Sequence, residues 1–169
     1  KTRYTLDVSI GNEVYTAESY LPEAVPIMSL ETDYLAASGP IDEGYQVYVR
    51  FQDDGNADNF YRFKHSINDT LQHAGDNLQV IDDRLFNGGF TRAPLFQQIF
   101  DKGDEVMVEL VHFDEQSYSY FNSLADIISQ GQGPNAGTAA PANPNSNWSN
   151  GALGYFSASH SSKKSILIQ

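Results

Sequence analysis

Alternation of apolar and polar residues with a period of two is the feature that most restricts how this chain can fold. It is clearest in YQVYVRFQ, residues 45–52, where Tyr45, Val47, Val49 and Phe51 occupy every second position. Successive side chains of a β-strand point to opposite faces, so this spacing indicates a strand. The same period recurs in residues 4–10, 60–65 and 104–113. A mainly β fold is therefore expected.

Turn-forming residues indicate how these strands connect. Gly11-Asn12 lies between two alternating segments, so residues 4–21 are predicted to form a hairpin. DDGNADN separates residues 45–52 from 60–65, and these two strands are predicted to form a second hairpin. The strand at 104–113 is apolar on both faces, which favours a central position in its sheet.

The chain is predicted to end in two closing strands, GALGYFSAS (residues 151–159) and SKKSILI. Burial of Ile166 and Ile168 on one face would contribute about 1.5–3 kcal/mol for each side chain. Leu167 points to the other face and would then need cover there.

One amphipathic helix is predicted at about residues 114–130. Asp114 can cap its first turn, and Glu115 follows where the helix dipole favours negative charge. A helical stripe then comprises Tyr118, Phe121, Leu124, Ile127 and Ile128. The Gly-, Pro- and Asn-rich residues 131–147 follow as a long loop. The expected fold is an antiparallel β-sandwich or partly closed barrel with this one helix.

Composition excludes several functional classes. The net charge of -12 repels phosphate backbones, so nucleic acid is not expected as a partner. Without cysteine, the chain has no disulfide, thiolate nucleophile or Cys-based metal site. No window approaches the ~18 consecutive apolar residues of a membrane helix.

Asp54, Asn56 and Asp58 resemble the first ligands of a calcium-binding loop. Asn59 and His65, however, stand where that loop requires glycine and a bidentate glutamate. We therefore favour an Asx-rich turn, with a weak adventitious ion as the alternative, and we expect no metal or other cofactor.

Candidate catalytic groups are few. A hydrolase could use Asp53, Asp54, Asp82 or Asp83, but the adjacent pair Asp82 and Asp83 should point to opposite faces of a strand, at a solvated edge. Gly-x-Ser-x-Gly does not occur, and the four histidines lack metal-ligand spacing. The sequence favours a protein that is not an enzyme.

Aromatic and amide side chains in polar segments suggest a ligand site instead. Trp148 and Asn147 lie in loop 131–150, and Tyr118 lies near the helix start. A flat ring can stack on a sugar or contact a peptide, so these three residues are candidate ligand-binding residues. Alternatively, Trp148 plugs the core of the domain, and the other aromatic residues are ordinary strand formers.

Four segments carry a resemblance to a known family. In order, they are NFYRF after an acidic turn, GDEVMVEL, SYSYFNSL and NPNSNWSNGALGYFSASHSSKKSILI. Over about residues 45–169 the chain resembles domain of unknown function 4249, a large family of lipoproteins from Bacteroidetes. Residues 4–35 resemble the end of the family's N-terminal Ig-like domain. The resemblance implies a remnant or last hairpin of that domain at 1–38 and a main β domain at 39–169.

The resemblance also implies a setting. Family members are exported and anchored by lipid in the outer membrane, at its periplasmic or cell-surface face. An accessory role beside a TonB-dependent receptor, in uptake or capture, is expected. The lipidated cysteine is absent from this chain, so any anchor lies outside it. Asp69-Thr70-Leu71 resembles a periplasmic O-glycosylation motif of that phylum, with Thr70 as acceptor.

Overall fold

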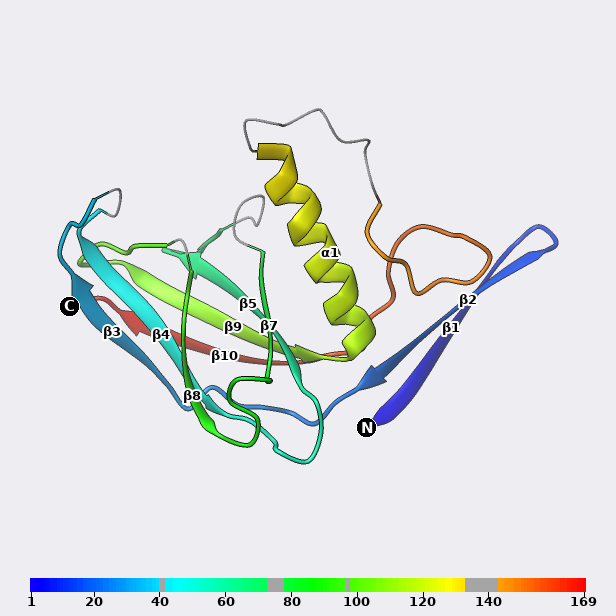
Figure 1. The fold of residues 1–169 in the computed structure, drawn as a ribbon, viewed down its shortest axis with the longest axis horizontal. Helices are drawn as coiled ribbons and strands as arrows, with labels where there is room; N and C mark the ends of the chain where they lie inside the picture. The colour runs from blue at the N-terminus through cyan, green and yellow to red at the C-terminus, as the bar shows by residue number, and fades with distance from the viewer. Residues whose placement is uncertain (40–41, 73–77, 97, 133–142) are drawn as a thin grey trace.

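The computed structural model describes residues 1–39, 42–72, 78–96, 98–132 and 143–169 (Figure 1). Within these ranges the chain is mainly β, with antiparallel pairing throughout and one helix. The elements are β1 (Thr2–Ile10), β2 (Glu13–Leu21), β3 (Ser29–Leu35), β4 (Gly44–Gln52), β5 (Phe60–Ile67), β6 (Thr70–Leu71), β7 (Gln79–Asp82), β8 (Phe90–Pro94), β9 (Glu105–Phe113), α1 (Glu115–Gln132) and β10 (His160–Leu167).

Two sheets form the body of the domain. One has the order β3-β4-β8, and the other has the order β10-β9-β5-β6, with β7 also paired to β5. Helix α1 crosses the larger sheet on the side away from the smaller one (Figure 1). The described strands form open sheets and no closed barrel. The predicted sandwich-like β fold with one helix is confirmed.

The core lies between the two sheets and follows from the two-residue period. Val47, Val49 and Phe51 of β4 are fully buried on one face. Phe51 packs against Tyr61 of β5, with ring centroids 4.9 Å apart, and against Phe63 at 6.2 Å. Strand β9 pairs with β5 on one side and β10 on the other, which confirms its predicted central position.

The predicted hairpin between residues 45–52 and 60–65 is wrong. Strand β4 belongs to the three-stranded sheet, and β5 belongs to the other. The connection crosses between the sheets, because its backbone bonds to residues distant in sequence. The amide of Asp53 donates to Gly89 O at 3.0 Å, and the amide of Asp83 donates to Asn59 O at 3.1 Å.

Only the second of the two predicted closing strands is present. Strand β10 pairs with β9 from His160 to Leu167, but GALGYFSAS forms no strand. Gly151 and Gly154 have φ values of 69° and 111°, outside the extended region. Phe156 N donates to the side chain of Asn147 at 3.1 Å. The Asn147 side chain thus accepts the amide hydrogen bond of Phe156 that pairing with a neighbouring strand would require.

The β1–β2 hairpin extends sideways from the sandwich (Figure 1). Its predicted pairing is confirmed, with Leu6 opposite Ala17 and nine residues in continuous register. Strand β3 pairs with β4 in the main body. The division into residues 1–38 and 39–169 stays a prediction.

The chain's last residues allow a matched test of burial. Ile168 is 2% exposed, whereas Leu167 is 55% exposed and does not find the predicted cover. We expect Ile168→Ala to lower the free energy of unfolding by about 2–5 kcal/mol, because it leaves a cavity in the core. Leu167→Ala should change it by less than about 0.5 kcal/mol. Urea denaturation measures both, and equal effects would contradict the packing described.

Candidate functional site

Asp114 joins the helix to the hairpin. It stands between the end of β9 and the start of α1, and its Oδ1 accepts bonds from Ser117 N at 2.8 Å and Ser117 Oγ at 2.5 Å. This is the predicted helix cap. Its Oδ2 accepts bonds from Ser19 Oγ at 2.7 Å and Tyr20 N at 2.8 Å, both on β2. One carboxylate therefore fixes two elements that are far apart in sequence.

The segment before β10 is held at the same point. Tyr155 donates its hydroxyl to Asp114 Oδ1 at 3.2 Å and also bonds to Ser117 Oγ. Ala158 N donates to Ser19 Oγ at 2.9 Å. The Tyr155 ring stacks on Tyr120 of α1 with centroids 4.7 Å apart. These bonds explain how residues 155–158 are fixed without being a strand.

Hydrogen bonding determines the ionisation of Asp114. Burial by itself raises the pKa of this carboxyl. The bonds donated by Ser117, Tyr20 and Ser19 have the larger combined effect and hold the pKa below its ordinary value. Asp114 is therefore an anion that accepts five hydrogen bonds at neutral pH.

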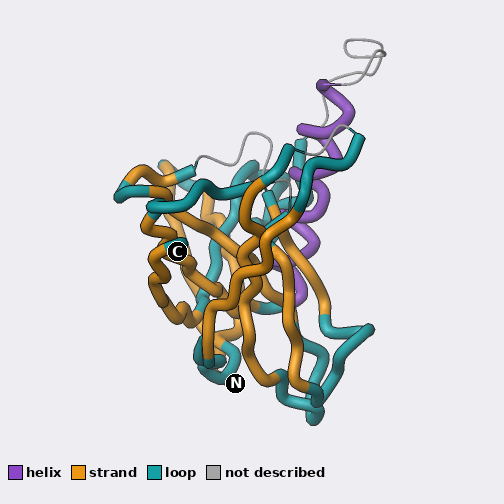
Figure 2. The backbone as a smooth tube through the Cα atoms, turned by 90° about the vertical axis from the view of Figure 1, so that its left-hand side faces the viewer, coloured by secondary structure: helices purple, strands orange, loops and turns teal. Residues whose placement is uncertain are grey.

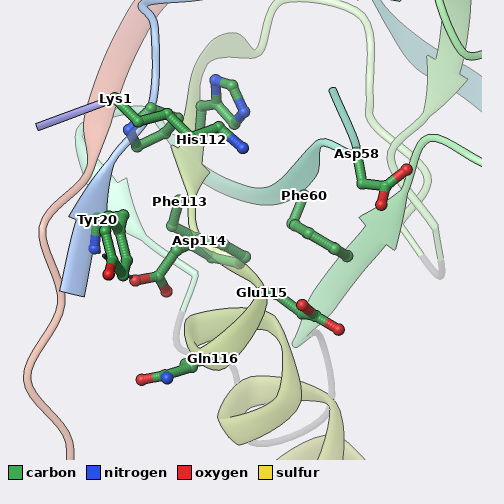
Figure 3. A pocket seen from close by; sticks show the side chains of 10 residues that line it. Lys1, Tyr20, Asp58, Phe60, His112, Phe113, Asp114, Glu115 and Gln116 are labelled. Atoms are coloured by element: carbon green, nitrogen blue, oxygen red, sulfur yellow. Dashed lines mark hydrogen bonds between the residues drawn. The ribbon is translucent and has the colours of Figure 1, made fainter. Parts of the chain in front are cut away.

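Three adjoining hollows surround the first turns of α1, and we call them together the α1 groove. The first, of about 290 Å³, lies between the helix start and the end of β9 (Figure 3). The second, of about 630 Å³, lies between α1 and the end of β7, and the third, of about 570 Å³, lies against residues 145–149. Asp58, Phe60 and Glu115 border both the first and the second, while Ser119 and Asn145 border both the second and the third.

The predicted ligand residue Tyr118 borders the second hollow. Its ring lies against Phe60, with centroids 5.1 Å apart, and its hydroxyl donates to Asp82 Oδ2 at 3.3 Å. Burial, followed by the negative charge of Asp82, raises the pKa of Tyr118. Asp82 itself is paired with Arg84 at 2.7 Å, and that bond lowers the pKa of Asp82.

Asn147 and Trp148 border the third hollow, but they have different roles. The Asn147 amide donates to Glu18 O at 3.0 Å and to Phe156 O at 2.7 Å, so it holds the fold together. Trp148 is half-buried against the hairpin, where its backbone forms a bridge with Ala17. It is not among the residues of the sandwich core in the described ranges.

The four candidate catalytic carboxylates each hold a turn. Asp53 accepts bonds from Tyr61 Oη at 2.5 Å and Gly88 N at 2.9 Å. Asp83 Oδ2 accepts a bond from Asn59 N at 2.9 Å, and burial raises the pKa of Asp83. The interpretation of Asp83 as solvated is wrong, because it is 2% exposed. Strand β7 ends at Asp82, so the chain bends there and both Asp82 and Asp83 border the second hollow.

Of the three residues that resemble calcium ligands, Asp54 and Asn56 form a turn. Asp54 Oδ1 accepts bonds from Asn56 N at 3.1 Å and Asn56 Nδ2 at 2.6 Å, which is the geometry of an Asx turn. Asp58 instead borders the α1 groove. Within the described ranges, no three His or carboxylate groups are placed to share a metal ion.

Thr70 lies exposed in the short strand β6, beside Asn68 and Asp69, which have φ values of 49° and 64°. Thr70 pairs with Ile67 and so directly follows the two-residue turn. Glycosylation of Thr70 stays a prediction.

Fold and site together define a β-sandwich domain with one covering helix, a polar groove beside that helix and a projecting hairpin. A family model described as Domain of unknown function (DUF4249) matches residues 1–165, and the chain belongs to this family. No curated protein and no solved structure gives a significant match. The one described helix, α1, is too polar for a bilayer span.

Replacement of Asp114 tests its role as a connector. We expect Asp114→Ala to lower the free energy of unfolding by roughly 2–4 kcal/mol at pH 7, because a helix cap and the bonds to β2 are lost together. Asp126→Asn, an exposed change on the same helix, should have almost no effect. Urea denaturation compares the two variants.

The difference in unfolding free energy between the unmodified protein and Asp114→Ala should depend on pH. A carboxyl whose pKa is lowered by folding stabilises the protein fully above its ordinary pKa and loses this effect as the pH falls through the lower folded value. The stability gap between the unmodified protein and Asp114→Ala should therefore be constant above about pH 5 and shrink toward pH 2. A gap that widens on acidification would contradict the account.

Proposed function

We propose that this chain is the non-enzymatic binding part of an outer-membrane accessory lipoprotein. It acts at the periplasmic or cell-surface face, anchored by lipid outside this chain, and partners a TonB-dependent receptor in uptake or capture. Membership of the DUF4249 family supports this proposal, together with the resemblance described from the sequence. The observation that carries it is a row of exposed apolar side chains along β1 of the β1–β2 hairpin.

All nine residues of β1 are exposed. Alternate positions place Tyr4, Leu6, Val8 and Ile10 on one face, and their exposed fractions run from 36% at Val8 to 65% at Ile10. Contiguous exposed apolar side chains on a soluble domain mark interaction surfaces. A β-strand of this composition is expected to bury this face against another molecule.

A neighbouring hollow enlarges this face. Val8 and Ile10 border a space of about 410 Å³ with Trp148 and Leu153 on its other side. We call the combined area the hairpin surface; it comprises Tyr4, Leu6, Val8, Ile10, Trp148 and Leu153. An aromatic ring beside aliphatic groups is typical of the centre of a protein interface. The hairpin surface thus suits an apolar segment of a partner protein.

The candidate carboxylates are consistent with a role other than catalysis. Asp53 accepts bonds from Tyr61 and Gly88, Asp54 is bonded within its own turn, and Asp82 is paired with Arg84. A general base has to reach a substrate proton, which these bonds oppose. This supports binding, and not hydrolysis, as the proposed activity.

Capture of the receptor tests the proposal. The double variant Leu6→Lys/Val8→Lys places two charges on the hairpin surface and should abolish recovery of the receptor, because burying unpaired charge is costly. The matched control Thr5→Lys/Ser9→Lys changes the opposite face of the same strand and should retain it. The measurement is co-purification of the native, lipid-anchored protein from solubilised outer membranes, with the barrel identified by mass spectrometry. Recovery of the unmodified protein as a monomer without a receptor would refute the proposal.

A second candidate function is binding of a glycan or peptide through loop 131–150. The third hollow favours it, since Trp148 and the amides of Asn145 and Asn147 border one space. Residues 133–142 of this loop lie outside the described ranges.

Trp148→Ala separates this candidate from a purely structural role of the ring. If the loop binds a ligand, the variant should lose glycan or peptide binding on an array while its unfolding midpoint stays within a few degrees of the unmodified protein. A large drop in the midpoint would show instead that Trp148 mainly holds the hairpin against the body.

A further inference from the structure

We propose that two copies of this chain associate through the outer edge of β1. The two β1 strands pair antiparallel about a twofold axis, so that the two hairpins form one continuous four-stranded sheet. This association uses the backbone edge of β1, whereas the receptor proposed above contacts the apolar side chains on one face of the hairpin.

The opposite edge of the hairpin, on β2, is covered by other parts of the chain. Ser149 N donates to Thr16 O at 2.8 Å, and Thr16 N donates to Ser149 Oγ at 2.8 Å. Asn147 donates its side-chain amide to Glu18 O at 3.0 Å. The residues of β2 whose backbone bonds outward in this way are Val14, Thr16, Glu18 and Tyr20. This edge is therefore satisfied within the molecule.

The outer edge of β1 has no such cover in the described ranges. In an antiparallel ladder, two residues that face each other without exchanging hydrogen bonds both turn their N–H and C=O groups away from the neighbouring strand. The register places four residues of β1 opposite the outward-bonding residues of β2, namely Arg3, Thr5, Asp7 and Ser9. Their backbone groups point outward, and among the described residues only β2 bonds to the backbone of β1. This row of donors and acceptors is a template for a further strand.

Strand β1 also lacks the features that usually keep edge strands from pairing. It runs for nine residues in continuous register, without a bulge, a proline or a lysine. Its two charged side chains, Arg3 and Asp7, lie on the face opposite the apolar row. A long, regular and partly apolar edge strand is expected to associate, and a sheet of only two strands gains stability from additional strands.

Charge complementarity identifies the added strand as β1 of a second copy. When the antiparallel pairing is centred on Thr5, Arg3 of each copy lies opposite Asp7 of the other, and the two Thr5 residues face each other. Opposite-charge pairs and Thr–Thr pairs both stabilise antiparallel strands. Centring the pairing on Leu6 forms no charge pair, and centring it on Asp7 opposes two carboxylates. The twofold arrangement about Thr5 forms two charge pairs at once.

The charged side chains are available for these pairs. Asp7 Oδ1 accepts a bond from Thr16 Oγ1 at 2.7 Å, and no cation is paired with Asp7 in the described part of the chain. Arg3 bonds to Glu18 at 2.9 Å through Nη2, but a guanidinium carries five N–H donors and can bind a second carboxylate. Both side chains are exposed.

The same register brings apolar side chains of the two copies together. Tyr4 lies opposite Leu6 of the second copy, and Val8 lies opposite Thr2, all on one face of the continuous sheet. Directly opposed side chains of neighbouring strands have Cβ atoms about 5 Å apart, so these side chains contact each other. The pairing thus partly covers side chains that are exposed in a single copy.

A single introduced cysteine tests the register, because the chain contains none. Thr5→Cys should form a disulfide-linked dimer when air oxidation is catalysed by copper phenanthroline. Opposed residues that exchange hydrogen bonds have Cα atoms about 5.5 Å apart, which is within the disulfide range. The matched control is Ser9→Cys, on the same face of the same strand, because the proposed register places the two cysteines about 26 Å apart. Non-reducing electrophoresis compares the two, and equal cross-linking would overturn the proposal.

Exchange of the two charges tests the same pairing without a covalent bond. Sedimentation velocity of the unmodified chain should show a monomer–dimer equilibrium at concentrations up to about 100 μM. Arg3→Asp opposes two pairs of carboxylates and Asp7→Arg opposes two pairs of guanidinium groups, so each variant should weaken the dimer about tenfold.

A mixture of Arg3→Asp and Asp7→Arg restores opposite charges at both positions and should form a heterodimer. Loss of folding cannot produce association on mixing. Attraction between whole molecules cannot produce it either, because both variants keep most of the net charge of -12. A mixture that stays monomeric would overturn the proposal.

The remaining outcomes are equally decisive. If the unmodified chain is monomeric at every concentration and Thr5→Cys forms no disulfide, a second copy does not occupy the edge of β1 and the proposal is wrong. These measurements use the purified chain alone, so their result is independent of whether a receptor is recovered from membranes.

Discussion

The carboxylate of Asp114 is the interaction on which the arrangement of this protein depends. It caps α1 through Ser117, bonds to β2 through Ser19 and Tyr20, and accepts the hydroxyl of Tyr155. Residues 41 and 95 positions away from Asp114 in the sequence thus meet at this one ionised group. A partly buried anion is stable there because its oxygens receive several donors, some of them backbone amides. Further bonds tie β2 to the segment before β10, among them Asn147 Nδ2 to Glu18 O at 3.0 Å and Ser149 N to Thr16 O at 2.8 Å.

This junction lies between two surfaces with different chemistry. The hairpin surface, on one side, is apolar and projects from the body, whereas the α1 groove, on the other, is acidic and concave (Figure 2 shows the helix beside the strands from the side). An apolar strand face suits association with another protein. Both surfaces are bordered by segments that Asp114 and Asn147 fix to β2.

Local patterns allowed correct prediction of the elements but not of their long-range partners. Strands β4 and β9, the first hairpin and α1 follow from residue periods that depend on burial of one face. The pairing of 45–52 with 60–65 was wrong, because buried Asp53 bonds to Gly88, 35 residues away. Residues 151–159 have strand-like composition, but glycines at positive φ and the Asn147 side chain give them another path.

The site was predictable in the same limited way. Tyr118 follows from its place near the helix start, whereas its partner Asp82, 36 residues earlier, carries no local signal. The cap at Asp114 could be read from sequence, but the bonds from Ser19 and Tyr20 could not. The burial of His112 and Asp83 could not be predicted from the local sequence.

Hydrogen exchange at individual amides tests whether Asp114 ties the β1–β2 hairpin to the body of the domain. The amide of Tyr20 bonds to Asp114 Oδ2 although the paired strand β1 is exposed throughout. If Asp114 ties the hairpin to the body, Tyr20 should exchange slowly at neutral pH, with protection close to that of the Ser117 amide on the same carboxylate. Rapid exchange at Tyr20 beside a protected Ser117 would show that the hairpin moves independently, and it would contradict the account.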